Sequence, residues 1–378
     1  MSSIVYNAMV LREPYSGVEV TVHELLGALA SRSTFPICAY VPPQCRALPE
    51  SPRLDVRTSR MGNSRLLRIV WEQTCLPALL RKANAPLLHA PAYVAPLAAP
   101  CPTVLTVHDL HALTHPQFCT TANRLHYATL LPRSIRRAAA IIVFSDYTRR
   151  NIIRHFPETA PRIAVIPPGL SPAFHRCTDT AHLRSVKTKY ALPDDFLLFV
   201  GDLSARKNLD GILAAFVQVR KHYPDIRLVL AGSSSPTTTA ALRHTLQRLG
   251  ITDGVHFTGY VEQPDLPTLY SLAKVFVFPS HDEGFGIPPL EAMACGCPVV
   301  CSGGAPTENC GAAALTCDPN DPTTIAEATL ALLDNPTLRH EKITEGYSTA
   351  AAFSWKNAAR ATEDVYVNVL GNNGMTKR

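Results

Sequence analysis

Short apolar runs alternate with segments of helical periodicity along the second half of the chain. The apolar runs, which predict buried strands, lie at residues 196–200, 226–231, 255–258, 275–278, 298–301 and 313–316. Between them, helical patterns lie at 207–221, 237–249, 265–272, 288–295 and 322–334. Strands that alternate with helices imply parallel βαβ units and a doubly wound sheet.

The first half follows the same order less regularly. Its predicted strands are 3–7, 36–41, 54–57, 87–89, 103–107 and 140–144, and its predicted helices are 17–31, 64–82 and 121–137. We therefore predict an α/β protein with two Rossmann-like domains, 1–168 and 169–353, with a boundary in the proline-rich stretch at Pro167-Pro168-Gly169. After it, Phe353-Ser-Trp355 opens a last amphipathic helix, about 354–370, that we expect to pack back on the first domain.

The length and composition agree with two globular domains. The chain has 378 residues, more than one core usually fills, and 46% of them are hydrophobic. No segment offers about 18 uninterrupted apolar residues, and the first residues lack a basic n-region, so we expect a cytoplasmic protein. Eleven cysteines without repeated zinc-type spacing favour reduced thiols over a disulfide framework or a metal site.

Two glutamates eight residues apart mark the strongest candidate site. Glu283 follows the predicted strand 275–278 on its loop, and we expect Glu291 in the first turn of the next helix, which Pro288 and Pro289 open. Ligands bind at this edge of open α/β sheets, so we predict an anion on the intervening amides and hydroxyl groups on the carboxylates. The amides belong to Gly284, Phe285, Gly286 and Ile287. The alternative is that both glutamates only cap a surface helix, which would be favoured for Glu291 alone; the pair with its glycines favours a ligand.

Adjacent cations follow the strand 196–200. Arg206 can grip a phosphate with two hydrogen bonds and Lys207 supplies a point charge, so the pair suits a diphosphate. A solvated helix start is the alternative. Positive charge at a helix N-terminus opposes the dipole, however, and calls for a compensating anion.

Two positions in the first half are weaker candidates. Gly17 opens a helix after the first strand and would let a diphosphate or an acceptor hydroxyl approach closely, although a plain turn explains it equally well. His108 ends the strand 103–107 beside Asp109, where a structural role is the more common one. The sequence has no Asp-x-Asp clamp, no P-loop and no Gly-x-Gly-x-x-Gly after the first strand, which disfavours metal-dependent transfer, NTP hydrolysis and nicotinamide chemistry.

Taken in order, these segments resemble the retaining glycosyltransferases of family 4, the "group 1" glycosyl transferases with the GT-B fold. The segments that carry the resemblance are Gly17, Thr-Val-His108-Asp109-Leu, Phe144-Ser-Asp-Tyr-Thr148, Pro167-Pro-Gly169, Arg206-Lys207-Asn208, the Glu-x7-Glu pair Glu283 and Glu291, and Phe353-Ser-Trp355. The resemblance implies two Rossmann-like domains that face each other across a cleft. It also implies transfer of a hexose from a nucleotide-diphosphate sugar to an acceptor hydroxyl on a glycan or lipid-linked glycan.

The resemblance assigns roles to the candidate residues. Arg206 and Lys207 would neutralise the departing diphosphate, Glu283 would hold the sugar hydroxyls and Glu291 the ribose. The amides around Gly286 would hold phosphate or sugar, and His108 would line the cleft near the sugar. No cofactor or metal is expected, and the segment from His108 to Phe118 is similar to mannosyltransferases. A nucleotide-sugar epimerase and a nucleotide-sugar-binding pseudoenzyme are the rival functions.

Charge is divided unevenly along the chain. Residues 1–170 hold 18 Lys and Arg against 9 Asp and Glu, a net +9, whereas residues 171–378 hold 18 against 21, a net −3. We therefore predict an anionic acceptor, or peripheral contact with the inner face of an anionic membrane, and no nucleic-acid partner. A basic surface that only serves solubility is the alternative. The cations cited for this prediction are Arg53, Arg57, Arg60, Arg65, Arg68, Arg81, Lys82, Arg136, Arg137, Arg149 and Arg150.

Overall fold

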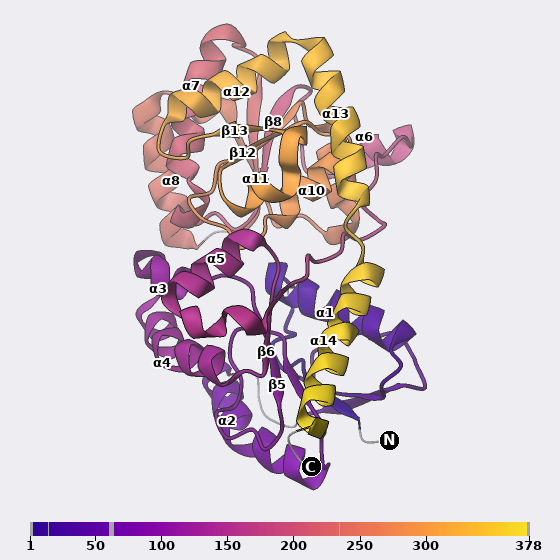
Figure 1. Ribbon diagram of the computed structural model, residues 1–378. Helices are drawn as coiled ribbons and strands as arrows, with labels where there is room; N and C mark the ends of the chain where they lie inside the picture. Colours follow the sequence, from indigo (N-terminus) through magenta and orange to yellow (C-terminus); the bar gives the residue numbers. More distant parts are fainter. Residues whose placement is uncertain (1–2, 14, 60–63, 234, 376–378) are drawn as a thin grey trace. The chain divides into compact units, whose positions relative to one another are not determined.

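The computed structural model describes residues 3–13, 15–59, 64–233 and 235–375. Arg60, one of the cations cited above, lies outside these ranges. The chain divides into two compact units, Met1–Gly169 with Ser354–Arg378, and Leu170–Phe353. Each unit has one parallel sheet with helices around it, so the predicted α/β class is confirmed (Figure 1).

The first unit has a seven-stranded sheet in the order β3-β2-β1-β4-β5-β6-β7. The strands are β1 (Ile4–Asn7), β2 (Ile37–Val41), β3 (Leu54–Thr58), β4 (Leu88–Ala90), β5 (Thr103–Val107), β6 (Ala140–Val143) and β7 (Ile163–Val165). The helices are α1 (Gly17–Arg32), α2 (Arg65–Lys82), α3 (His111–Thr114), α4 (Thr121–Arg137), α5 (Asp146–His155) and α14 (Trp355–Met375), with 3-10 turns η1 (Pro116–Phe118) and η2 (Pro157–Arg162). All the strands pair in parallel, and the strand order reverses between β1 and β4.

The last helix, α14, completes the core of the first unit although it is the last element of the chain. Tyr366 on α14 is fully buried, and its hydroxyl lies 2.6 Å from Nδ1 of His89 on β4. On its other side, Nε2 of His89 lies 2.9 Å from the hydroxyl of Thr106 on β5. Burial lowers the pKa of His89 to about 3, so the imidazole is neutral and joins α14 to two strands by hydrogen bonds.

The second unit has a six-stranded sheet in the order β10-β9-β8-β11-β12-β13. The strands are β8 (Phe196–Val200), β9 (Arg227–Ala231), β10 (Val255–Gly259), β11 (Val275–Phe278), β12 (Val299–Ser302) and β13 (Ala314–Cys317). The helices are α6 (Thr180–Lys189), α7 (Leu209–His222), α8 (Pro236–Leu249), α9 (Leu266–Leu272), α10 (Ile287–Ala294), α11 (Ala305–Cys310), α12 (Pro322–Asp334) and α13 (Pro336–Ala351). Four 3-10 turns lie between them: η3 (Ala205–Lys207), η4 (Thr252–Gly254), η5 (Gln263–Asp265) and η6 (Gly311–Ala313).

The topology of the second unit determines where a ligand site can form. The strand order reverses between β8 and β11, which are neighbours in the sheet and pair in parallel. Chain connections from these two strands leave in opposite directions, so the loops at their carboxyl ends diverge and leave room for a ligand. The predicted cations follow β8 and the predicted glutamates follow β11, so both motifs lie at this switch point.

Candidate functional site

Arg206 and Lys207 lie on the 3-10 turn η3, which follows β8. The sequence predicted that Lys207 begins a helix; the helix α7 in fact begins at Leu209. The reason is Asn208, whose backbone is left-handed (φ 58°) and which caps α7 with its side chain. Asparagine tolerates this conformation better than most residues. The two cations therefore stand before the helix rather than in its first turn.

Both cations converge on one carboxylate oxygen. Nζ of Lys207 lies 2.6 Å, and Nη1 of Arg206 lies 2.9 Å, from Oε1 of Glu283. The side chains of Lys207 and Glu283 are only 8% and 12% exposed, so water screens this ion pair weakly. Nζ of Lys207 also lies 4.8 Å from the centre of the Phe278 ring, within cation–π range. Glu283 is thus the anion that the two cations share.

The backbone joins the same two loops. The amide of His281 donates to the carbonyl of Arg206 at 3.0 Å, and Nη1 of Arg206 donates to the carbonyl of Asp282 at 3.2 Å. The carboxylate of Asp202 lies 3.8 Å from Nη2 of Arg206 on the other side. Consequently the guanidinium is held by groups from both loops before any ligand binds.

Asn208 fixes the position of the cation loop. Its side-chain oxygen accepts from the amide of Gly211, and its side-chain nitrogen donates to the carbonyls of Pro279 and Pro319 at 3.0 and 2.6 Å. These carbonyls belong to the loops after β11 and β13. One buried amide side chain therefore ties together three segments at the carboxyl edge of the sheet.

The helix α10 begins at Ile287, one residue earlier than predicted, and this places Glu291 in the second turn instead of the first. The cause is Gly286, which precedes the helix in a left-handed conformation (φ 86°). A side chain there would approach the Pro306 ring to 3.1 Å, so only glycine fits without strain. Pro288 and Pro289 carry no N–H, so the backbone donors of the first turn come from the residues around them.

Glu291 lies in surroundings unlike those of Glu283. Its Oε2 accepts a hydrogen bond of 2.9 Å from the hydroxyl of Tyr270, a fully buried residue of α9. Burial raises the pKa of Glu291 to about 7, and the hydrogen bond from Tyr270 only partly offsets that effect. The carboxyl group is therefore poised between its neutral and charged forms near neutral pH.

Two serines at the same edge were not anticipated from the sequence. The hydroxyl oxygens of Ser280, after β11, and Ser204, after β8, are buried and have no hydrogen-bond partner among the described residues. A buried hydroxyl without a partner is costly, so such groups call for a ligand or ordered water. The available signal was their place directly after an apolar strand, but serine is too common in loops for that to identify them.

In the first unit, His108 follows β5 and is 8% exposed. Its Nε2 lies 2.8 Å from the carbonyl of Pro91, and since a carbonyl only accepts, Nε2 carries the proton. Burial lowers the pKa of His108, so the ring is neutral and Nδ1 is a hydrogen-bond acceptor. The neighbouring Asp109 accepts from the hydroxyl of Tyr93 at 2.6 Å and from the amide of His111 at 3.0 Å, a structural role.

Gly17 is the first residue of α1, after the capping residue Ser16. A side chain at this position would meet no atom within 4 Å, and the backbone does not require glycine there. The protein itself therefore gives no reason for a glycine at the start of this helix. A ligand that approaches the helix N-terminus closely would supply one.

Both units of the chain match known protein families. Residues 185–349 match the model of the glycosyl transferases group 1, and residues 15–174 match that of Glycosyltransferase Family 4. O-antigen chain mannosyltransferase B of Escherichia coli is 34% identical over 270 residues, which cover 70% of this chain and 69% of that enzyme. The chain belongs to glycosyltransferase family 4. The resemblance read from the sequence is thereby confirmed, and the protein is a glycosyltransferase that acts on nucleotide sugars.

Other family 4 relatives are longer than this chain. The serotype-specific mannosyltransferase WbdA of Escherichia coli is 28% identical over 293 residues, which cover 75% of this chain but 36% of WbdA. Among solved structures, sucrose-phosphate synthase from Thermosynechococcus elongatus has a TM-score of 0.78 at 20% identity and covers 98% of this chain and 100% of its own. Anabaena HepE in complex with UDP and glucose has a TM-score of 0.75 at 17% identity over 97% of this chain and 100% of its own. These structures establish the GT-B fold.

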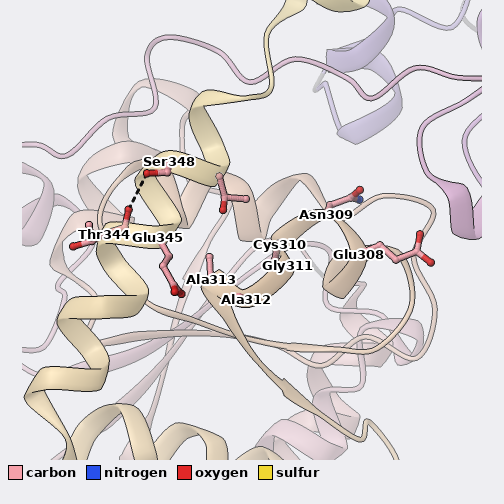
Figure 2. Close-up of a pocket in the computed structure, with 10 residues that line it drawn as sticks. Glu308, Asn309, Cys310, Gly311, Ala312, Ala313, Thr344, Glu345 and Ser348 are labelled. Atoms are coloured by element: carbon pink, nitrogen blue, oxygen red, sulfur yellow. Dashed lines mark hydrogen bonds between the residues drawn. The ribbon is translucent and has the colours of Figure 1, made fainter.

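One hollow of the second unit is lined by none of the candidate site residues. It measures about 410 Å³ and is lined by residues of α11, η6 and α13, including Glu308, Asn309, Cys310, Thr344 and Glu345 (Figure 2). In this view the side chain of Glu308 points away from Thr344 and Glu345. The lining presents none of the cations or unpaired hydroxyls that gather at the switch point, so we do not assign the donor to this hollow.

The structure also bears on two other expectations from the sequence, the state of the cysteines and the lack of a membrane-spanning segment. All eleven cysteines are free thiols, and burial raises the pKa of both Cys295 and Cys297, so these two are small buried groups at the end of α10. In the described part of the chain, none of the helices combines the length and apolar character that a membrane span requires.

Proposed function

We propose that this glycosyltransferase is a retaining hexosyltransferase. It moves a hexose from a nucleotide-diphosphate sugar to a hydroxyl of a glycan or lipid-linked glycan. The observation that carries the proposal is the meeting of Arg206 and Lys207 with Glu283 at the switch point of the second sheet. Mannose is the favoured sugar because the two relatives described above are named mannosyltransferases.

Stabilisation of the leaving group is the main task of the site. A nucleoside diphosphate departs only if the charge that develops on it meets preorganised donors. Arg206 and Lys207 face two carboxylates, Glu283 and the more distant, exposed Asp202, so the cluster offers a diphosphate directed hydrogen-bond donors rather than a net positive charge. Their contacts with Glu283 and the Asp282 carbonyl already hold both cations in place, and little reorganisation is needed when the donor binds.

The other site residues take the rest of the donor. Glu283 accepts hydrogen bonds from the sugar hydroxyls, Glu291 holds the ribose hydroxyls, and the amides around Gly286 receive phosphate or sugar oxygens. On the first unit, Nδ1 of His108 accepts a hydrogen bond from the transferred sugar, and the start of α1 at Gly17 admits the donor closely. His108 is neutral and its Nε2 is engaged, so it orients the substrate rather than abstracting a proton.

The reaction proceeds on one face of the sugar. The bond between the anomeric carbon and the phosphate oxygen breaks, and the acceptor oxygen bonds to the same face. The acceptor proton passes to the departing phosphate, so no protein nucleophile is required. Because protein cations and amides bind the diphosphate, the reaction should also need no divalent metal.

A panel of radiolabelled nucleotide sugars, scored for release of the nucleoside diphosphate with and without EDTA, tests the activity and its metal independence. NMR of the glycoside then reads its anomeric configuration. An inverted product, or activity that EDTA abolishes and Mn²⁺ restores, would contradict the mechanism. An epimerised donor would indicate the epimerase, and binding without turnover would indicate the pseudoenzyme.

We further propose that the acceptor is anionic or is presented at an anionic membrane. The support is the net charge of +9 on residues 1–170. Several of the cations cited for this prediction are already neutralised: Arg57 by Asp55 at 2.8 Å, Arg149 by Asp146 at 2.8 Å and Arg136 by Glu158 at 3.3 Å. The net charge does not say where the unpaired cations gather, so contact with a membrane requires a more local surface.

A further inference from the structure

The outer face of α2 is apolar although it is exposed. Leu66 is 68% exposed, Leu67 43% and Val70 46%. The next exposed positions on the same helix, Thr74, Cys75 and Ala78, are uncharged as well, and exposed charges follow only in its last turn, at Arg81 and Lys82. Its opposite face is buried through Trp71, Leu76 and Leu80. A helix on the surface of a globular protein normally presents charged residues outward, so this face lacks the usual polar cover.

The start of α4 lies against the start of α2 and extends the apolar face. The guanidinium of Arg65 on α2 donates a hydrogen bond to the Asn123 side chain on α4 and lies 5.6 Å from the centre of the Tyr127 ring. Between these two residues, Leu125 is 70% exposed, the largest value among the exposed large hydrophobic residues. We call Leu66, Leu67, Val70 and Leu125 the apolar tip. Figure 1 shows both helices in the first unit.

The two helices that carry the apolar tip are strongly basic. They contain eight cations, Arg65, Arg68, Arg81, Lys82, Arg124, Arg133, Arg136 and Arg137, and one acid, Glu72, which is buried. Their net charge is therefore +7. Glu72 and Glu158 lie near Arg68 and Arg136, and the other six cations have no carboxylate partner within the described part of the chain.

From this juxtaposition we propose that the apolar tip inserts into an anionic lipid bilayer, with the surrounding arginines on the lipid headgroups. The inference rests on the proposed lipid-linked acceptor and names the surface that would bring the enzyme to it. Exposed leucines gain by leaving water for the boundary of the acyl chains, and each nearby cation gains from the negative surface potential. Neither contribution needs a spanning helix.

The positive charge of α2 and α4 favours a lipid bilayer over two other possible occupants of the apolar tip. A second copy of the chain would bring another +7 against the same face, and the repulsion would oppose an apolar contact of this size. A protein partner would need an acidic surface around an apolar centre. A bilayer that contains phosphatidylglycerol supplies both the apolar interior and the negative charge over any area.

Flotation with vesicles tests the surface. Wild-type protein should float with phosphatidylcholine vesicles that contain phosphatidylglycerol, and much less with phosphatidylcholine alone. Each of Leu66→Glu and Leu125→Glu should lower the partition coefficient by about tenfold, because burial of a leucine side chain is lost and a like charge is added. The control is Val367→Glu on α14, which places the same charge at a site that is 53% exposed in the same unit and should change nothing.

Tryptophan fluorescence tests whether the apolar tip inserts into the bilayer. Tryptophan at the tip, in Leu66→Trp or Leu125→Trp, should shift its emission to the blue on vesicles and be quenched by lipids brominated in the acyl chains. The matched variant Val367→Trp should show neither effect. Quenching of Val367→Trp to the same extent would mean that another face meets the membrane and would overturn the proposal.

Other results would also decide whether the apolar tip inserts into a bilayer. Absence of wild-type flotation at low salt, or flotation of the glutamate variants equal to that of wild type, would overturn it. So would a lipid-free dimer that Leu66→Glu converts to monomer, since a second copy would then cover the tip. Release of nucleoside diphosphate from nucleotide sugars, measured without vesicles, should be unchanged in these variants; its loss in wild type would instead refute the proposed function.

Discussion

The two glutamates of the signature are eight residues apart in the sequence, yet their surroundings are opposite. Glu283 lies within 3 Å of two cations, which both contact the same oxygen. Among the described residues, no cation pairs with Glu291: its carboxyl group contacts the Tyr270 hydroxyl, and burial raises its pKa to about 7. The first carboxylate is shared by two cations, whereas burial leaves the second balanced between two protonation states near neutral pH.

This difference separates two tasks that the sequence motif presents as one. Glu283 is coupled to the groups that would face the leaving diphosphate, so its removal disturbs the cations as well as any contact it makes with substrate. Glu291 is coupled to a neutral hydroxyl on the neighbouring helix α9, so its removal should leave the cations where they are. The predictions below test whether the two positions behave so differently.

Loss of a cation should have the largest effect. Replacing Lys207 or Arg206 with Ala should lower kcat by about 10²–10³-fold, because each removes a charge-assisted contact to the leaving group. Single-turnover rates with a nucleotide sugar measure this. The control is Lys274→Ala, which breaks a comparable ion pair of 2.9 Å with Asp195 at an exposed site of the same unit. Wild-type rates in either cation variant would refute the diphosphate role.

The glutamates should then differ in which kinetic constant they change. Glu283→Ala should lower kcat by more than Glu291→Ala does, whereas Glu291→Ala should mainly raise the donor KM, by about tenfold for one lost charged hydrogen bond. Glu345→Ala, which breaks a 2.9 Å pair with Lys342 on α13, serves as the control. The reverse order would mean that the two roles have been exchanged.

The donor KM should also depend on pH through Glu291. If only the carboxylate binds the ribose well, protonation below a pKa of about 7 weakens binding, and KM should rise about tenfold from pH 8 to pH 6. The variant Glu291→Gln cannot titrate and should show a flat profile. Equal slopes in both proteins would assign the pH dependence to another group.

The last expected effect concerns stability rather than activity. The folded protein binds the Glu291 proton more tightly than the unfolded chain, whose carboxyl titrates near 4.5, so the stabilisation is complete below pH 4.5 and is lost as pH rises through about 7. Glu291→Gln cannot ionise, so it does not lose this stabilisation as the pH rises. Its Tm should therefore exceed that of wild type increasingly between pH 5 and pH 8, by an amount that corresponds to at most about 3 kcal/mol. A Tm difference independent of pH would contradict the assignment.

Much of the fold could be predicted because buried parallel strands are short apolar runs. The bounds of β5, β8 and β11 agree with the prediction to the residue, since turn residues limit each run on both sides. The helices α6 and α13 were missed because few of their residues face the core: Val186 in the first, Gly346 and Ala350 in the second. Such helices offer too few buried apolar residues to be recognised in the sequence.

Less of the candidate site could be predicted, because its contacts join distant segments. The sequence identified the cations and the glutamates as candidate site residues. It did not predict that Lys207 contacts Glu283, because the two residues are 76 positions apart. Likewise, nothing local indicates that Asn208 bonds to two proline carbonyls, or that Tyr270 reaches Glu291. The start of α10 was misplaced by one residue because the left-handed Gly286 sets it, and Glu291 moved to the second turn as a result.

The packing of α14 onto the first sheet has a consequence for how the protein folds during its synthesis on the ribosome. Tyr366 and its neighbours Ala358, Ala359, Val365 and Val369 belong to the same core as β1, β2 and α1. These residues are translated only after the whole second unit has been made. The unit that is begun first is thus finished last, and its sheet must wait, with His89 lacking its tyrosine partner, while 184 further residues, Leu170–Phe353, leave the exit tunnel.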